Sequence, residues 1–167
     1  MSPDLAWRPM RAADLARVEP LGNAIHTGHP ERPAVFAERQ ALCPVGCHVL
    51  DRGDRLVGYV ISHPWTLGAP PMLDTLLGAL PAAADTWYIH DLALHGAARG
   101  SGAGGAMVGH LAALAAAHGL ATLSLIAVGA SPPFWGRHGF RPHPLAGTKV
   151  ASYGPGAAYM VRALDQP

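Results

Sequence analysis

Apolar and polar residues in the first half of the chain recur with the periods of helices and strands. Leu15, Val18 and Leu21 fall on one face of a predicted helix. Gly53 lies between two β-rich runs and suits a tight turn, which indicates a hairpin. The predicted elements are a strand over residues 5–10, helices over 11–25 and 32–42, and a hairpin over 47–62.

The second half continues with strands and helices after an irregular insertion over residues 63–81. Within this insertion, Met72 to Leu80 is predicted to form a helical turn or two. A later helix has an apolar stripe and ends at Gly119, a typical C-cap. The strand after it is almost entirely apolar, which predicts a central place in a sheet. The predicted elements are strands over 86–94, 120–128, 139–143 and 157–164 and helices over 101–119 and 131–138.

Composition narrows the class of protein. Residues 1–167 fit one mixed α/β domain without a linker or repeat, and 50% of them are apolar, as in a soluble globular protein. The first residues lead us to expect no signal peptide, and the sequence has no apolar run of the roughly 18 residues that span a bilayer. Cys43 and Cys47 are expected to be reduced thiols without a four-ligand metal site. A cytoplasmic protein without metal or membrane partner is expected.

Charge is unevenly distributed along the chain. The net charge of +1 does not favour a nucleic-acid partner. Residues 1–91 contain 10 acidic and 7 basic side chains, whereas residues 92–162 contain 5 basic and no acidic ones. A basic half suits an anionic ligand and an acidic half a cationic one, although uneven surface charge alone gives the same distribution.

The stretch "ARGSGAGGAM", residues 98–107, places four glycines just after a predicted strand and at the start of a predicted helix. Backbone N–H groups at a helix start point outward, and the helix dipole favours a negative charge there. Glycines let phosphate oxygens approach this backbone closely, and Arg99 adds a cation. The stretch therefore predicts an anion site.

Three kinds of phosphate-binding loop compete for this stretch. A nucleoside-triphosphate loop needs a Lys followed by Ser or Thr after its glycines, and none follows here. Gly100, Gly102 and Gly105 match a dinucleotide fingerprint, but that motif requires an acidic residue about 20 positions later. No Asp or Glu occurs between residues 92 and 164.

The third form is Arg/Gln-x-x-Gly-x-Gly/Ala, which Arg99, Gly102 and Gly104 match in register. With this loop the chain resembles the GNAT acyltransferase superfamily. The strand "YIHDLAL" resembles the fourth strand of that family, and "FWGRHGF" its late segment ending in Gly-Phe. The opening "LAWRPMRAADL" is also similar. The resemblance covers residues 5–140.

The resemblance implies a fold, a donor and an acceptor. The implied fold is a single GNAT-like α/β (mixed α+β) domain with a central, mostly antiparallel twisted sheet, parallel and splayed fourth and fifth strands, and helices on both faces. The implied cosubstrate is acetyl-CoA, and the acceptor is a primary amine of a small molecule or a peptide N-terminus. A homodimer is expected by family analogy. The residues expected to bind acetyl-CoA are Leu92, Ala93, Leu94, Arg99, Gly100, Ser101, Gly102, Ala103, Gly104, Gly105, Phe134 and Trp135.

His90 and Asp91 are the candidate catalytic residues, because family members often carry Glu-Asp at these two positions. In direct transfer an amine loses its proton and attacks the thioester, and histidine is suited to accept that proton near neutral pH. Strand alternation predicts that His90 and Asp91 face opposite sides of the sheet. Asp91 would then orient His90 through backbone or water, or hold a substrate cation. A purely structural histidine and carboxylate remain the alternatives.

The sequence departs from the family where an acid for the thiolate is expected. Trp135 replaces the family's Tyr, and indole is far too weak an acid; Val128 replaces an Asn. Three explanations stay open. The CoA thiolate leaves unprotonated, Ser131 or His138 substitutes as the acid, or the protein is a non-catalytic acyl-CoA-binding sensor.

Overall fold

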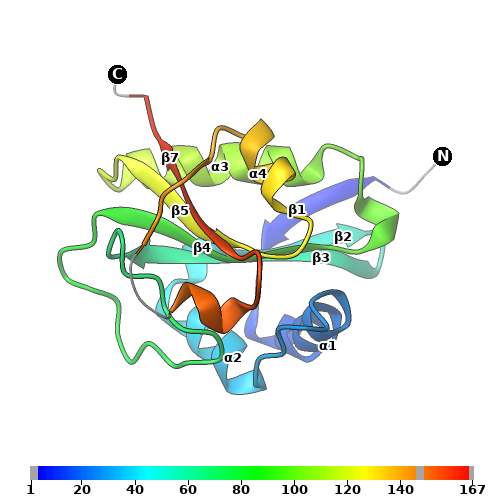
Figure 1. The fold of residues 1–167 in the computed structure, drawn as a ribbon. Helices are drawn as coiled ribbons and strands as arrows, with labels where there is room; N and C mark the ends of the chain where they lie inside the picture. Colours follow the sequence, from blue (N-terminus) through cyan, green and yellow to red (C-terminus); the bar gives the residue numbers. More distant parts are fainter. Residues whose placement is uncertain (1–3, 146–148, 166–167) are drawn as a thin grey trace.

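The computed structural model describes residues 4–145 and 149–165. A seven-stranded sheet in the order β1–β2–β3–β4–β5–β7–β6 forms its centre (Figure 1). The strands are Leu5–Pro9 (β1), Cys47–Arg52 (β2), Arg55–Trp65 (β3), Thr86–Leu94 (β4), Thr122–Ala127 (β5), Arg141–Pro142 (β6) and Ala158–Ala163 (β7). The helices are Leu15–Ile25 (α1), Pro33–Leu42 (α2), Ala103–Ala117 (α3) and Pro132–Arg137 (α4). Short 3-10 turns cover Ala12–Asp14, Pro44–Gly46, Gly96–Ala98 and Val150–Tyr153.

Neighbouring strands pair antiparallel except β4 and β5, which are parallel. The parallel pairing is short, because it joins only Trp87–Ile89 to Leu123–Leu125. Beyond these residues β4 and β5 separate and leave a fork in the middle of the sheet. The predicted mostly antiparallel sheet with parallel, splayed fourth and fifth strands is confirmed.

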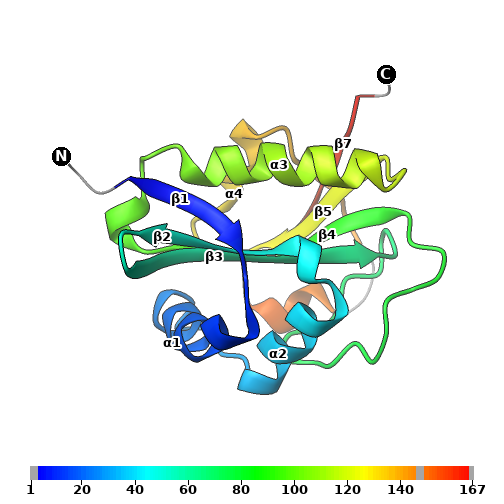
Figure 2. The same ribbon diagram turned by 180° about the vertical axis from the view of Figure 1, so that it is seen from behind.

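Helices cover both faces of the sheet. α1 and α2 lie on one face, and α3 and α4 on the other (Figures 1 and 2). Under α1 and α2 the core includes Val18, Phe36 and Tyr59, and under α3 it includes Leu111 and Leu125. The apolar stripes that predicted these helices therefore pack against the sheet as expected.

The predicted helical turns from Met72 to Leu80 do not form. Asp74 adopts a positive φ of 56°, and its carboxylate accepts hydrogen bonds from the backbone N–H and Nε of Arg32. Further along, Glu38 of α2 accepts a hydrogen bond from the backbone N–H of Leu77. The segment is irregular because its polar groups form hydrogen bonds with Arg32, the residue just before α2, and with Glu38 of α2.

Both ends of α3 differ slightly from the predicted bounds. The helix begins at Ala103 because Gly102 is its N-cap in the left-handed conformation, with φ 85°. It ends at Ala117, and Gly119 follows with φ 73°, as its prediction as a C-cap requires. No helix in residues 4–145 and 149–165 is long and apolar enough to cross a membrane.

Candidate functional site

A cavity of about 670 Å³ opens where β4 and β5 separate. Residues 89–94 of β4 line it, including Leu92, Ala93 and Leu94. Other lining residues come from the segment before α2, from the loop after β4 and from the start of α4. Three parts of the chain therefore meet at the cavity. They are β4, which carries the predicted catalytic residues, the α1–α2 connection, and the first residues of the glycine loop (residues 99–105).

His90 and Asp91 face the same side of the sheet, which contradicts the predicted alternation. The register between β3 and β4 shifts at this point, so that His90 is the extra residue of a β-bulge. Ile89 and Leu92 consequently both pack in the core beneath α3. His90 and Asp91 both reach residues of the α1–α2 side instead.

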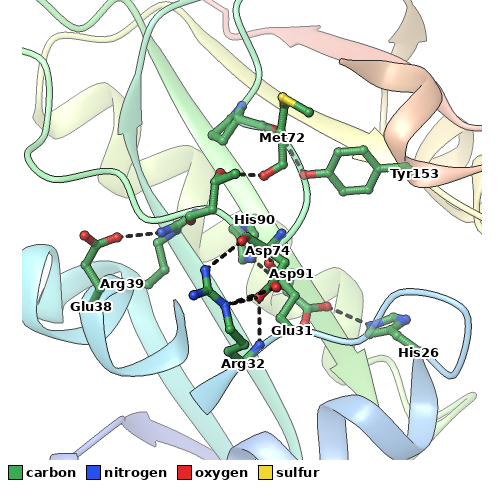
Figure 3. A network of polar contacts seen from close by, with 12 residues as sticks. His26, Glu31, Arg32, Glu38, Arg39, Met72, Asp74, His90, Asp91 and Tyr153 are labelled. Carbon is green, nitrogen blue, oxygen red and sulfur yellow. Dashed lines mark hydrogen bonds and ion pairs between the residues drawn. The ribbon is translucent and has the colours of Figure 1, made fainter. Parts of the chain in front are cut away.

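Glu31 holds the imidazole of His90 (Figure 3). Glu31 lies just before α2, and its Oε1 is 2.7 Å from His90 Nε2. Its Oε2 accepts a hydrogen bond of 3.1 Å from the backbone N–H of Asp74. The side chain of His90 is only 2% exposed, and its Nδ1 has no hydrogen-bond partner among the described residues. Because a carboxylate accepts, neutral His90 carries its hydrogen on Nε2 and keeps a lone pair on Nδ1.

Asp91 has both carboxylate oxygens engaged. Oδ1 lies 2.8 Å from Nε2 of His26, and Oδ2 accepts a hydrogen bond from the hydroxyl of Tyr59. Burial opposes the charge on Asp91, but the nearby His26 and both hydrogen bonds outweigh it and lower the pKa of Asp91. Burial also opposes the charge on His26, and Asp91 with Glu31 outweighs it and raises the pKa of His26. Asp91 thus fixes His26, while Glu31 orients His90.

The Asp91–His26 pair should make stability depend on pH. The pKa of His26 is raised above its ordinary 6.5, so its contribution is complete below pH 6.5 and is lost as pH rises through the raised value. The pKa of Asp91 is lowered below 3.8, so its contribution is lost only as pH falls through that lowered value. In urea unfolding, we expect the free-energy difference between wild type and His26→Gln to be largest near about pH 5 and smaller near about pH 9. An equal difference at both pH values would contradict this assignment.

The glycine loop has two open positions before α3. Gly100 and Gly102 have φ values of 74° and 85°, and nothing lies within 4 Å of a Cβ built on either. Ser101 Oγ accepts a hydrogen bond of 3.2 Å from the N–H of Ala103. Within the described ranges, the N–H groups of Gly104 and Gly105 have no acceptor. This backbone has the geometry of an anion site at a helix N-terminus.

Gly104 and Gly105 also make room for α4. A Cβ on Gly104 would lie 3.1 Å from the ring of Phe134, and one on Gly105 would lie 2.8 Å from the ring of His138. These two glycines are therefore required for the packing of α4 on α3, independently of any ligand. Arg99 and Gly100 line the cavity. Residues 101–105 are not among its lining residues and lead into the first turn of α3.

Phe134 and Trp135, two of the residues expected to bind acetyl-CoA, line the cavity from α4. Trp135 packs edge to face on Phe134 and on Phe140 and is 7% exposed. Of the two residues considered as substitute acids, Ser131 lines the cavity but donates its hydroxyl hydrogen to Val128 O at 2.7 Å. His138 is not among the lining residues and packs against Phe134.

Several lining residues carry no signal in the sequence. His26 and Glu31 reach the cavity from the α1–α2 connection, Leu73 from the irregular segment after β3, and Tyr153 from the turn Val150–Tyr153. Glu31 and His90 are 59 positions apart, and no motif links them. Among the residues that the structure describes, no group of three His, Cys, Asp or Glu side chains is arranged to hold a metal ion.

Comparison with known proteins gives a family match and several similar folds. The pattern of the acetyltransferase (GNAT) family matches residues 12–140. No curated protein matches the chain.

Three solved structures illustrate the shared fold. Ard1 from Thermoplasma volcanium is 14% identical, with a TM-score of 0.73 over 97% of this chain and 99% of that chain. Naa50 from Arabidopsis thaliana, in complex with the bisubstrate analogue CoA-Ac-MVNAL, is 16% identical, with a TM-score of 0.71 over 94% and 96%. The GphF GNAT-like decarboxylase, in complex with isobutyryl-CoA, is 16% identical, with a TM-score of 0.77 over 96% and 100%. At these identities the likeness shows the fold alone.

Proposed function

Since the chain belongs to the acetyltransferase (GNAT) family, we propose that it transfers an acetyl group from acetyl-CoA to a primary amine of a small molecule or a peptide N-terminus. The observation that carries this proposal is one cavity in which the β4–β5 fork, the first residues of the glycine loop and the Glu31–His90 pair meet. This arrangement supports direct transfer, because that reaction needs a proton acceptor close to the thioester.

The residues that would hold acetyl-CoA fit a polyphosphate ligand. The N–H groups of Gly104 and Gly105 lack an acceptor within the described chain, and the space before Gly100 and Gly102 is open. Arg99 adds a fixed positive charge beside them. When bound, acetyl-CoA supplies an activated acyl group on a thiol leaving group. The proposed set is Arg99 and residues 100–105 for the pyrophosphate, the backbone of residues 92–94 for the pantetheine arm, and Phe134 and Trp135 for the wall.

His90 is proposed as the base that accepts the proton of the attacking ammonium group. Its Nε2–H donates to Glu31, so Nδ1 is the acceptor atom, either directly or through a water molecule. Glu31 then acts as a positioning residue, because it fixes the ring and the tautomer. Both oxygens of Asp91 are engaged, one by His26 and one by the buried hydroxyl of Tyr59, so its proposed role is to hold His26 at the cavity.

The thiol of CoA is proposed to leave as a thiolate. Trp135 cannot protonate it, and the hydroxyl hydrogen of Ser131 is already donated to Val128 O. A thiol ionises near about pH 8.5, so departure without an acid is chemically accessible. His138 lies outside the cavity lining, which argues against it as the acid.

Glu31→Gln should lower kcat by about 10- to 100-fold with little change in the affinity for acetyl-CoA. The amide can donate to Nε2, and His90 then carries its hydrogen on Nδ1 and no longer accepts a proton there. The pH profile of kcat/KM is the informative measurement, because loss of packing alone would not change its shape. Asp54→Asn, in the exposed hairpin turn, is the matched carboxylate-to-amide control. A Glu31→Gln profile identical to wild type would remove Glu31 from the mechanism.

CoA release from acetyl-CoA across a panel of amines tests the proposed function. Release that requires an amine supports transfer. Binding of acetyl-CoA without release on any amine would instead favour the acyl-CoA-binding module, the alternative raised by Trp135.

A further inference from the structure

Among residues 4–145 and 149–165, the acceptor side of the cavity has anionic groups but no free cation. Glu31 and Asp91 line it together with His26, His29 and His90. Figure 3 shows Glu31, Asp91, His26 and His90. We propose that the acceptor is a primary amine whose α-carbon bears no free carboxylate, such as the N-terminal residue of a peptide or a simple amine. This inference rests on the proposed acyl transfer and narrows its substrate class.

Nearby arginines are already engaged elsewhere. Arg32 binds both carboxylate oxygens of Asp74 through Nε, at 3.2 and 3.1 Å, and donates to the carbonyl of Asp74 through Nη2. Arg39 is fully buried and donates to Glu38 and to the carbonyl of Thr75. Neither arginine lines the cavity, so neither is available to a substrate carboxylate.

Arg99 is the one lysine or arginine that lines the cavity within the described residues. It belongs to the loop assigned to the pyrophosphate, and its Nε donates to Leu94 O at 3.3 Å. With acetyl-CoA bound, its charge is directed to the phosphates. A substrate carboxylate would therefore compete with the donor for this group.

The histidines do not replace the missing cation. His26 is paired with Asp91 and His90 with Glu31, so a proton on either ring is balanced by its own carboxylate. His29 Nε2 is hydrogen-bonded to the carbonyl of Tyr153. An entering ammonium group meets Glu31 favourably, because neutral His90 leaves its carboxylate charge unbalanced, whereas an entering carboxylate is repelled by Glu31.

His90 gives an independent reason to place the amine here. Its side chain is 98% buried, yet Nδ1 has no partner within the described chain and the residue lines the cavity. A buried polar atom of this kind is normally satisfied, and an amine nitrogen or its water is a suitable partner. The carboxylate of a free amino acid would be held within a few ångströms of that amine, and hence close to Glu31 and Asp91.

Three compounds with the same aromatic side chain distinguish acceptors with a carboxylate from acceptors without one. Phenylalaninamide represents a peptide N-terminus, phenethylamine a simple amine, and phenylalanine carries the carboxylate. Repulsion between unit charges about 5 Å apart at an effective dielectric of about 20 corresponds to a preference of roughly 250-fold. We expect kcat/KM for both carboxylate-free amines to exceed that for phenylalanine by about this factor. Phenethylamine is no less basic than phenylalanine, so basicity does not explain its preference.

A charge introduced at Leu73 provides the matched test. Leu73 lines the cavity and has no proposed catalytic role. Leu73→Arg should reduce the preference for phenethylamine over phenylalanine by about 10-fold or more, whereas Leu73→Gln should leave it close to wild type. An equal effect of both variants would indicate lost packing and would contradict the role of charge.

Titration of the three compounds into the CoA-loaded protein separates the two proposals. Tighter binding of the carboxylate-free amines without any release of CoA from acetyl-CoA would support the substrate class and overturn acyl transfer. Phenylalanine binding or reacting as well as phenethylamine would overturn the substrate class, with Arg99 the implied partner of its carboxylate. If none of the three compounds binds, the proposed substrate class is overturned as well.

Discussion

Replacing His90 with alanine should lower kcat for acyl transfer by about 100- to 10,000-fold while the affinity for acetyl-CoA changes little. The variant removes the buried Nδ1 that is proposed to accept the proton of the amine. The residues proposed to bind acetyl-CoA lie on the loop, the β4 backbone and α4, so donor binding should persist. Single-turnover release of CoA, with acetyl-CoA saturating, measures the chemical step directly.

Two controls separate catalysis from stability in this experiment. His90→Ala leaves Glu31 buried without its partner, which costs stability, so retained binding of acetyl-CoA is needed to show that the variant is folded. His143→Ala, at an exposed histidine, should have nearly wild-type turnover. Turnover by His90→Ala within about twofold of wild type would mean that His90 is structural and that water or another group takes the proton.

Gly102→Asp should weaken binding of acetyl-CoA by at least about 100-fold. Gly102 is the N-cap of α3 with φ 85°, and the space before it is open. An aspartate there fills the space proposed for a phosphate and adds a like charge beside it. Calorimetric titration with acetyl-CoA measures the loss.

Gly102→Asn is the matched control, because asparagine has nearly the same size, tolerates positive φ and carries no charge. We expect it to retain clearly more affinity than Gly102→Asp. Equal affinity of the two variants would show that shape, not charge, decides the effect. Unchanged affinity in Gly102→Asp would remove the loop from the donor site.

Local patterns in the sequence were sufficient to predict most of the helices and strands, whereas the topology of the sheet was implied by the family resemblance. The strand at β4 was predicted with the bounds observed, and the apolar run at β5 indicated its central place in the sheet. Gly53 and Gly119 adopt the positive φ values that their predicted turn and C-cap require. These features depend on neighbours in the chain, which is why the sequence shows them.

The parts of the site that were missed depend on contacts between distant segments. The bulge at His90 reflects how β3 and β4 pair, and nothing in the local sequence marks it. Glu31 is one carboxylate among several in the first half of the chain, and only the folded chain brings it to His90. The segment from Met72 to Leu80 failed as a helix because Arg32 and Glu38 bind its polar groups. In each case a contact between residues far apart in the sequence outweighs the structure that the local sequence favours.

Calorimetric titration of the wild-type protein with acetyl-CoA, with NADH titrated in parallel, tests the central claim most directly. We expect one molecule of acetyl-CoA to bind per chain with a dissociation constant in about the micromolar range, and no heat of binding from NADH. Absence of binding by acetyl-CoA would contradict the donor assignment. The open glycines before α3 and the cavity at the β4–β5 fork would then serve a different ligand.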